Sequence, residues 1–157
     1  MTHEDLLDCA SVQECRDVTA LEQLLSTKIA NLELQLPKVS PGALAYLGDA
    51  VYELYVRSCY LLPPKRSQVY HRLVVAQVRA EAQAIHLNSL IPYLTNAELE
   101  IVRRGRNAAT KTPKRVNAEI YQQASSLETL VGYLYLTDYQ RLTQLLQKLQ
   151  FEPSPDE

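Results

Sequence analysis

Residues Leu44–Arg57 have the sequence LAYLGDAVYELYVR, in which a glycine and an aspartate interrupt an apolar run. The apolar residues on both sides of Gly48 and Asp49 keep the spacing of an α-helix. An interior glycine costs on the order of 1 kcal/mol relative to alanine, and a carboxylate within an apolar stretch needs a partner or water. The sequence therefore predicts that another part of the molecule offsets both costs at this point.

The remaining sequence is also helical in pattern and contains no convincing strand run, which predicts an all-α fold. The first helix is expected to begin at a Ser40 cap followed by proline, and to end before two consecutive prolines. The expected helices are Leu44–Leu61, Ser67–Asn88, Thr95–Arg104, Val116–Leu136 and Thr137–Leu149, with a short one over Thr19–Ser26.

Short sequence signals mark the helix ends. Thr95 with Glu98, and Thr137 with Gln140, match the capping box, in which two side chains satisfy the first free N–H groups. Gly105 is expected to end its helix, because glycine commonly follows the last helical residue. Helical spacing gives the expected buried faces: Leu44, Leu47, Val51, Leu54 and Tyr55 on the first helix, and Ile120, Ala124, Leu127, Val131 and Leu134 on the fourth.

Length and composition indicate one soluble folded domain. Of 157 residues, 46% are hydrophobic and 22% charged, and no apolar run reaches the ~18 residues of a membrane span. We expect an acidic extension over residues 1–36, the folded domain over 37–151 and a tail over 152–157. The N-terminus resembles neither a secretory signal nor a transit peptide, so a cytoplasmic location is predicted. Three cysteines without CxxC spacing argue against a disulfide framework and a zinc site.

Charge is distributed unevenly along the chain. Residues 1–36 contain seven acids and two bases, a net charge of −5, whereas residues 37–151 contain fourteen bases and eight acids, a net charge of +6. Six bases lie between Arg103 and Arg115 with no acid among them. This basic run predicts an anionic partner such as nucleic acid, although an ordinary solvated helix end has the same composition.

Two carboxylates stand near glycines on two of the expected helices. Asp49 follows Gly48, and Glu128 precedes Gly132 by about one helical turn. If the helices cross at the two glycines, the carboxylates meet and can share a cation. Carboxylate oxygens with open water positions are the ligands that Mg²⁺ prefers. By spacing alone, an acid on an amphipathic helix is more often a solvated surface residue.

Several motifs resemble the catalytic domain of the ribonuclease III family. LAYLGDAVYELYVR is similar to the signature helix of that domain, and SLETLVGYLYL is similar to its second acidic helix. With RRGRNA and the following TPK, they are most similar to Mini-ribonuclease III, the bacterial form made of the catalytic domain alone. The resemblance extends from about Pro41 to Leu149. Only eight residues follow, where larger enzymes carry a double-stranded RNA-binding domain, so the short form is expected.

The resemblance implies a homodimeric endoribonuclease that cleaves double-stranded RNA with Mg²⁺, or with Mn²⁺ in its place. It implies 5′-phosphate and 3′-hydroxyl products and maturation of the 23S ribosomal RNA precursor. Asp49 and Glu128 match the family's acids, so both are expected to be catalytic and to ligate the metal. Further acids of the larger enzymes are replaced by Gly42, Ala45 and Ser125, and one ion per site is expected.

The resemblance also implies that the basic run contacts RNA. Two other classes remain open: an inert RNA-binding or ribosome-associated module of the same fold would lose both acids, and a small-nucleotide phosphohydrolase would usually need His-Asp clusters. The three histidines have no spacing typical of a metal site. The expected RNA-binding residues are Arg103, Arg104, Arg106, Asn107, Lys111, Lys114 and Arg115.

Overall fold

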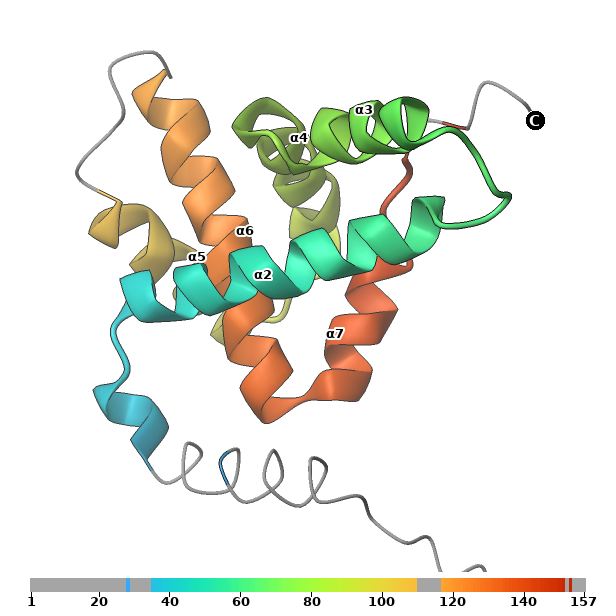
Figure 1. The fold of residues 1–157 in the computed structure, drawn as a ribbon. Helices are drawn as coiled ribbons and strands as arrows, with labels where there is room; N and C mark the ends of the chain where they lie inside the picture. Colours follow the sequence, from blue (N-terminus) through green and yellow to red (C-terminus); the bar gives the residue numbers. More distant parts are fainter. Residues whose placement is uncertain (1–27, 29–34, 110–116, 152, 154–157) are drawn as a thin grey trace, which may run out of the picture.

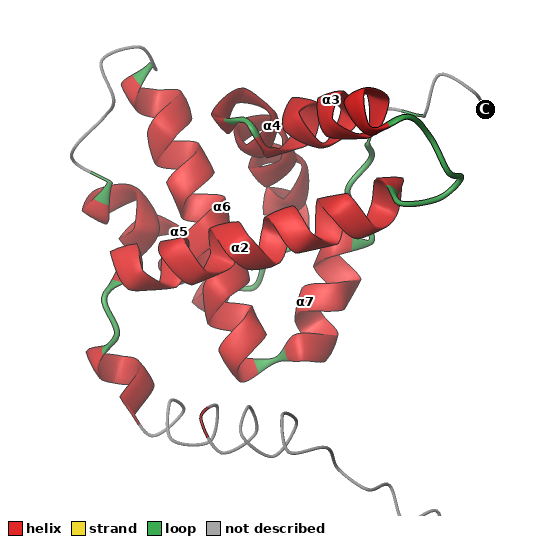
Figure 2. Cartoon of the chain, viewed as in Figure 1, coloured by secondary structure: helices red, strands yellow, loops and turns green. Residues whose placement is uncertain are grey.

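The computed structural model describes residues 28, 35–109, 117–151 and 153, and these residues form helices and loops with no strand (Figure 2). This confirms the all-α prediction. No helix among them is both long enough and apolar enough to cross a bilayer. The elements are η1 (Leu36–Lys38), α2 (Pro41–Tyr60), α3 (Ser67–Val78), α4 (Ala80–Leu90), η2 (Ile91–Tyr93), α5 (Asn96–Ala108), α6 (Ala118–Thr137) and α7 (Tyr139–Leu146).

Helix α6 is the centre of the domain, with α2, α4, α5 and α7 packed around it. Helix α2 lies across α6 in Figure 1, and α5 lies on the far side of α2 in that view. The expected buried face of α6 is confirmed for Ala124, Leu127, Val131 and Leu134, whereas Ile120 is only half-buried. A helix surrounded in this way must bury small and apolar residues on several sides, which explains its apolar composition.

The buried face of α2 differs from the prediction. Its fully buried residues recur every four positions: Leu44, Gly48, Tyr52, Val56 and Tyr60. The expected inclusion of Leu54 is wrong, because that side chain is 66% exposed. The apolar pattern of α2 is therefore wider than one core contact requires, and part of it faces outward.

The single helix expected over Ser67–Asn88 is also wrong, since the structure has two helices here. Arg79 has extended geometry (φ −66°, ψ 154°) and serves both as the C-cap of α3 and as the N-cap of α4. Helix α3, before the break, packs against α2, whereas α4, after the break, packs against α6. One straight helix could not follow both neighbours, and the sequence contains no glycine or proline that marks the break.

Helix ends follow the expected capping rules with two exceptions. The Ser40 hydroxyl accepts the Ala43 N–H at 3.1 Å, and Thr95 with Glu98 forms the expected capping box. The box expected at Thr137 is wrong: Thr137 ends α6, and the Asp138 carboxylate caps α7.

The expected end of α5 at Gly105 is also wrong, since α5 continues to Ala108. A Cβ on Gly105 would lie 2.5 Å from the Thr129 hydroxyl oxygen. This glycine therefore permits close packing of α5 on α6 rather than terminating the helix.

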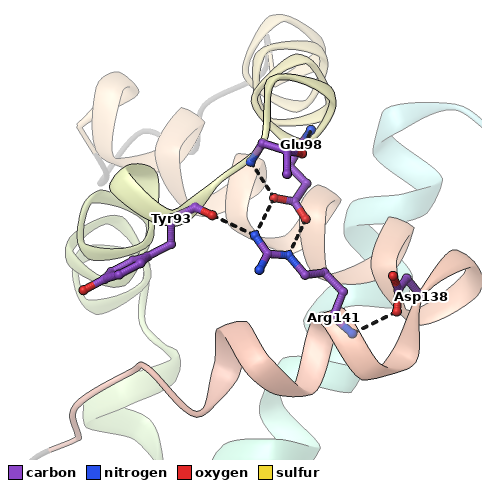
Figure 3. Close-up of polar contacts among 5 residues, drawn as sticks. Tyr93, Glu98, Asp138 and Arg141 are labelled. Atoms are coloured by element: carbon purple, nitrogen blue, oxygen red, sulfur yellow. Dashed lines mark hydrogen bonds and ion pairs between the residues drawn. The ribbon is translucent and has the colours of Figure 1, made fainter.

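An ion pair fixes α7 to the start of α5 (Figure 3). The Arg141 guanidinium donates to both carboxylate oxygens of Glu98, at 2.7 and 3.0 Å, and to the carbonyl of Tyr93 at 2.7 Å. Glu98 is 6% exposed and also accepts the backbone N–H of Thr95 at 2.8 Å. Each oxygen of this buried carboxylate thus has a donor, which is what burial of a charge requires.

Candidate active site at the crossing of α2 and α6

Helices α2 and α6 meet at two glycines. A Cβ placed on Gly48 would overlap the carbonyl oxygen of Glu128, and a Cβ on Gly132 would overlap the carbonyl oxygen of Leu44. Only glycine permits the backbones to approach this closely. The helices therefore do cross at Gly48 and Gly132, which is the condition for the two carboxylates to meet, and the crossing explains why α2 keeps a helix-weakening residue in its centre.

The crossing brings Asp49 and Glu128 to one pocket. The exposed Asp49 and the half-buried Glu128 both line it, and the charge of Asp49 acts on the Glu128 carboxyl. The pocket has a volume of about 270 Å³, and its walls come from α2, the end of α5 and α6. Its lining residues are Pro41, Gly42, Ala45, Tyr46, Asp49, Gly105, Ala108, Ala109, Tyr121, Ser125, Glu128 and Thr129.

The two carboxyls have perturbed pKa values. Burial, followed by the charge of Asp49, raises the pKa of Glu128 to about 7, and the side-chain amide of Gln83 opposes part of that shift. Burial and the charge of Glu53 also raise the pKa of Asp49 above its ordinary value. Two acids that repel each other in a partly dry pocket form a site where a cation would be stabilised.

The donor set fits Mg²⁺, which is commonly held by one or two carboxylates while it keeps water ligands or binds phosphate oxygens. The last turn of α5 contributes Gly105, Ala108 and Ala109 to the wall. The partial negative charge at a helix C-terminus also favours a cation. Among the described residues, no group of three or more His, Cys, Asp and Glu side chains is placed to hold a metal, so the site depends on this one pair.

The positions at which larger family members carry further acids lie on the same pocket. Gly42, Ala45 and Ser125 all line it, so the expectation of a site with fewer carboxylates agrees with the geometry. Glu53 is absent from the lining, and it forms a surface ion pair with Arg57 one turn away.

The described part of the basic run lies at the end of α5, next to the pocket. Arg103, Arg104, Arg106 and Asn107 are exposed there, and their neighbours Gly105 and Ala108 are pocket residues. Arg103 donates to Glu100 at 2.8 Å. The other predicted RNA-binding residues, Lys111, Lys114 and Arg115, lie outside the described residues.

Sequence reasoning missed Gln83 and Tyr121. Tyr121 lines the pocket, and the side-chain amide of Gln83 on α4 lowers the pKa of the Glu128 carboxyl. The only sequence signal for Gln83 is an amide in an alanine-rich stretch, AEAQA. The carboxyl group whose pKa it affects lies 45 positions away in sequence, on a different helix.

Comparison with known proteins places this geometry in a family. Residues 42–139 match the family model described as the ribonuclease III domain. A Mini-ribonuclease 3 from Synechocystis sp. is 64% identical over 112 residues, which are 71% of this chain and 78% of that protein. A Mini-ribonuclease 3 from Gloeobacter violaceus is 46% identical over 126 residues, 78% of this chain and 93% of that protein.

A solved structure gives the same result for the fold. The crystal structure of a protein from Fusobacterium nucleatum matches with a TM-score of 0.64 at 28% identity, covering 69% of this chain and 89% of that one. The matched family residues contain both carboxylates and both glycines of the crossing. The chain therefore belongs to the ribonuclease III family, in its Mini-ribonuclease III group, and is an endoribonuclease.

Proposed function

We propose that Asp49 and Glu128 hold a single Mg²⁺ ion, for which Mn²⁺ can substitute, and that they are the catalytic residues for cleavage of double-stranded RNA. The observation that supports this is the pair itself: two mutually repelling carboxylates share a pocket, and no described cation pairs with either. Without a functional cation, this arrangement only costs stability.

The two acids have different positions in the proposed mechanism. Exposed Asp49 lies where an RNA phosphate can arrive, while half-buried Glu128 holds its charge in a less hydrated part of the pocket. When bound, the metal would supply positive charge at a phosphate oxygen and an activated water. Hydrolysis joins the water oxygen to phosphorus and breaks the bond to the ribose 3′ oxygen, giving 5′-phosphate and 3′-hydroxyl ends.

The basic run would bring the RNA backbone to this pocket. Arg104 and Arg106 are exposed on the last turns of α5, whose backbone forms one wall of the pocket. A-form RNA presents phosphates and 2′-hydroxyls across its wide minor groove, so contacts of this kind recognise duplex shape rather than base sequence. Lys111, Lys114, Arg115 and Asn107 belong to the same proposed RNA-binding segment.

The apolar outer face of α2 supports the homodimer. A groove of about 380 Å³ lies between α2 and the α6–α7 corner, and exposed Leu54 and Tyr139 are among its lining residues. An isologous dimer would cover the same patch on both copies and would supply one pocket for each RNA strand.

Replacing Leu54 with Glu should shift the sedimentation profile from dimer to monomer, because it places a charge in the covered patch. The control is Ile85→Glu on α4, since Ile85 is equally exposed at 67% but lies outside this groove. A monomeric wild-type protein at micromolar concentration would contradict the dimer.

The substrate we propose is the precursor of 23S ribosomal RNA, cleaved in the cytoplasm. This substrate is supported by the similarity of the chain to Mini-ribonuclease 3 proteins. The family resemblance implies maturation of the 23S precursor. Cells depleted of the protein should accumulate 23S precursors with unprocessed ends, and normal ends would exclude this substrate.

The central experiment is Mg²⁺-dependent cleavage of a plain RNA duplex, with single-stranded RNA as control. Asp49→Asn and Glu128→Gln should each reduce cleavage by more than about a hundredfold, since loss of even an indirect metal contact costs 10- to 100-fold. Circular dichroism and duplex binding should stay close to wild type. Near-normal turnover in either variant would exclude the metal assignment. Duplex binding without any cleavage by the wild type would instead favour the inert RNA-binding module.

A further inference from the structure

The C-terminal turns of α5 carry positive charge that no described acid neutralises. Arg104 and Arg106 are exposed there, and neither forms an ion pair with a described residue. Glu100, one turn earlier, is already bound by Arg103, whose guanidinium donates to its two carboxylate oxygens at 2.8 and 2.5 Å. Arg104 and Arg106 therefore form an unneutralised cationic surface, the basic end of α5.

The first residue of α2 lies against this basic end. The Thr129 hydroxyl oxygen on α6 is 3.4 Å from the carbonyl oxygen of Pro41, and a Cβ on Gly105 would lie 2.5 Å from the same hydroxyl oxygen. Gly105 stands between the two arginines in sequence. One side chain thus contacts both the start of α2 and the basic end of α5, and Figure 1 shows the first turns of α2 beside α5.

The chain that leads into α2 at this point is acidic. Residues 1–36 contain seven acids and two bases, a net charge of −5. Glu33 precedes Pro41 by eight residues, so even a fully extended chain keeps the two within about 30 Å. Because the acids are covalently attached next to the basic end, their local concentration there exceeds that of a separate peptide.

We propose that the basic end of α5 is a docking surface for the acidic N-terminal segment, residues 1–36, which competes there with RNA. This rests on the proposed contact between RNA and α5. Exposed ion pairs are individually weak and are screened by salt, whereas a nucleic-acid duplex presents a dense row of phosphates. A long duplex displaces the segment, and a short anionic ligand competes with it less well.

Neutralising acids of the segment in the full chain tests this docking. The variant Asp17→Asn, Glu22→Gln and Glu33→Gln removes three charges without changing the length of the chain. In EDTA, its affinity for a short RNA duplex at low salt should rise about three- to tenfold, as expected for the loss of several weak exposed pairs. The slope of log affinity against log salt should become steeper by up to about 0.9 for each phosphate contact that the segment no longer blocks.

The matched control removes the same charge from the other end of the chain, with Glu152→Gln, Asp156→Asn and Glu157→Gln. These acids follow Phe151, whose ring centroid is 6.1 Å from that of Tyr60, the last residue of α2. The two ends of the 20-residue helix α2 are about 30 Å apart, some three Debye lengths at 0.1 M salt. The control should change RNA affinity by less than about twofold. An equal gain in the control would mean that only net charge matters, and would overturn the docking.

The double variant Arg104→Ala with Arg106→Ala separates the docking from the RNA contact on which it rests. Neutralising the three acids in this background should bring no further gain in RNA affinity, because the docking surface is gone. If the double variant binds RNA as tightly as wild type, the RNA contact fails and the competition with it. If the double variant binds more weakly but the acid variant binds like wild type, the docking alone is overturned.

A measurement without RNA examines the docking itself. Phenylglyoxal modifies accessible guanidinium groups, and mass spectrometry locates the modified residues. At low salt, Arg104 and Arg106 should react faster in the acid variant than in wild type, and the difference should disappear at 1 M salt, where the Debye length is about 3 Å. Exposed Arg72 on α3 serves as the internal reference and should react equally in both proteins. Equal rates at Arg104 and Arg106 in the two proteins at low salt would overturn the docking.

Discussion

Among the described residues, Glu98 is buried and Glu128 is half-buried, and the environments of these two glutamates are opposite. Glu98 at the start of α5 receives Arg141, whose hydrogen bonds lower the pKa of its carboxyl below the ordinary value (Figure 3). Glu128 in the middle of α6 faces Asp49, and burial together with that charge raises the pKa of its carboxyl to about 7. The first carboxylate is neutralised within the fold, whereas the second has no ion pair with a described residue.

The difference shows how the same residue type serves stability or function. A buried carboxylate with a guanidinium partner joins two helices, but its charge is no longer available to a ligand. A carboxylate opposite another carboxylate weakens the folded state and gains its compensation when a cation binds. Perturbed acids in a pocket are typical of functional sites for this reason.

The largest expected effect on stability comes from exchanging each glutamate for glutamine. Glu98→Gln should lower the free energy of unfolding by about 2–3 kcal/mol, since it leaves Arg141 without its charged partner. Glu128→Gln should leave stability unchanged or raise it by about 1 kcal/mol in metal-free buffer, because it removes a repulsion. Urea unfolding monitored by circular dichroism measures both. Equal losses of unfolding free energy in the two variants would mean that Glu128 also stabilises the fold.

The pH dependence of stability should differ in sign at the two glutamates. The folded-state pKa of Glu128 is about 7 against an ordinary 4.5, so the folded protein binds more protons between these values. Stability of the metal-free protein should therefore fall as pH rises through this window, by on the order of 2 kcal/mol. Glu98 has a lowered pKa, so its contribution is present above its ordinary pKa of 4.5 and is lost as pH falls through the folded-state value.

Urea unfolding in EDTA across about pH 3 to 8 tests both signs. Glu128→Gln should flatten the decline between about pH 5 and 7, and Glu98→Gln should flatten the acid loss below about pH 4.5. A wild-type curve that rises steadily from pH 5 to 7 would contradict the environment described for Glu128.

The smallest expected effect extends the comparison to the basic residues of α5. Arg103 is paired with Glu100, whereas Arg106 has no ion pair with a described residue. Arg106→Ala should reduce the slope of log affinity against log salt by about 0.9, the value for one lost phosphate contact. Arg103→Ala should change it less. Filter binding of a duplex at several salt concentrations measures both slopes. Identical slopes for both variants and the wild type would mean that RNA binds to another surface of the protein.

Local sequence patterns alone indicate a helical fold, the family resemblance and the candidate acids. Periodicity and local caps depend on neighbouring residues, so the Ser40 cap and the Thr95–Glu98 capping box were readable directly. The LGDAVYE and SLETLVGYLYL motifs led to Asp49 and Glu128, and the glycines beside them indicated the crossing that the structure has.

Features that depend on contacts between distant segments are visible only in the folded structure. The break at Arg79 lacks a local signal because it follows from packing α3 and α4 on different helices. Glycine at position 105 predicts a helix end, but in the structure it permits close contact with Thr129 on α6. The charged group that acts on each glutamate, Arg141 for Glu98 and Asp49 for Glu128, is more than 40 residues away in sequence. Because pKa values depend on burial and on nearby charges, the opposite states of the two acids follow from the folded arrangement alone.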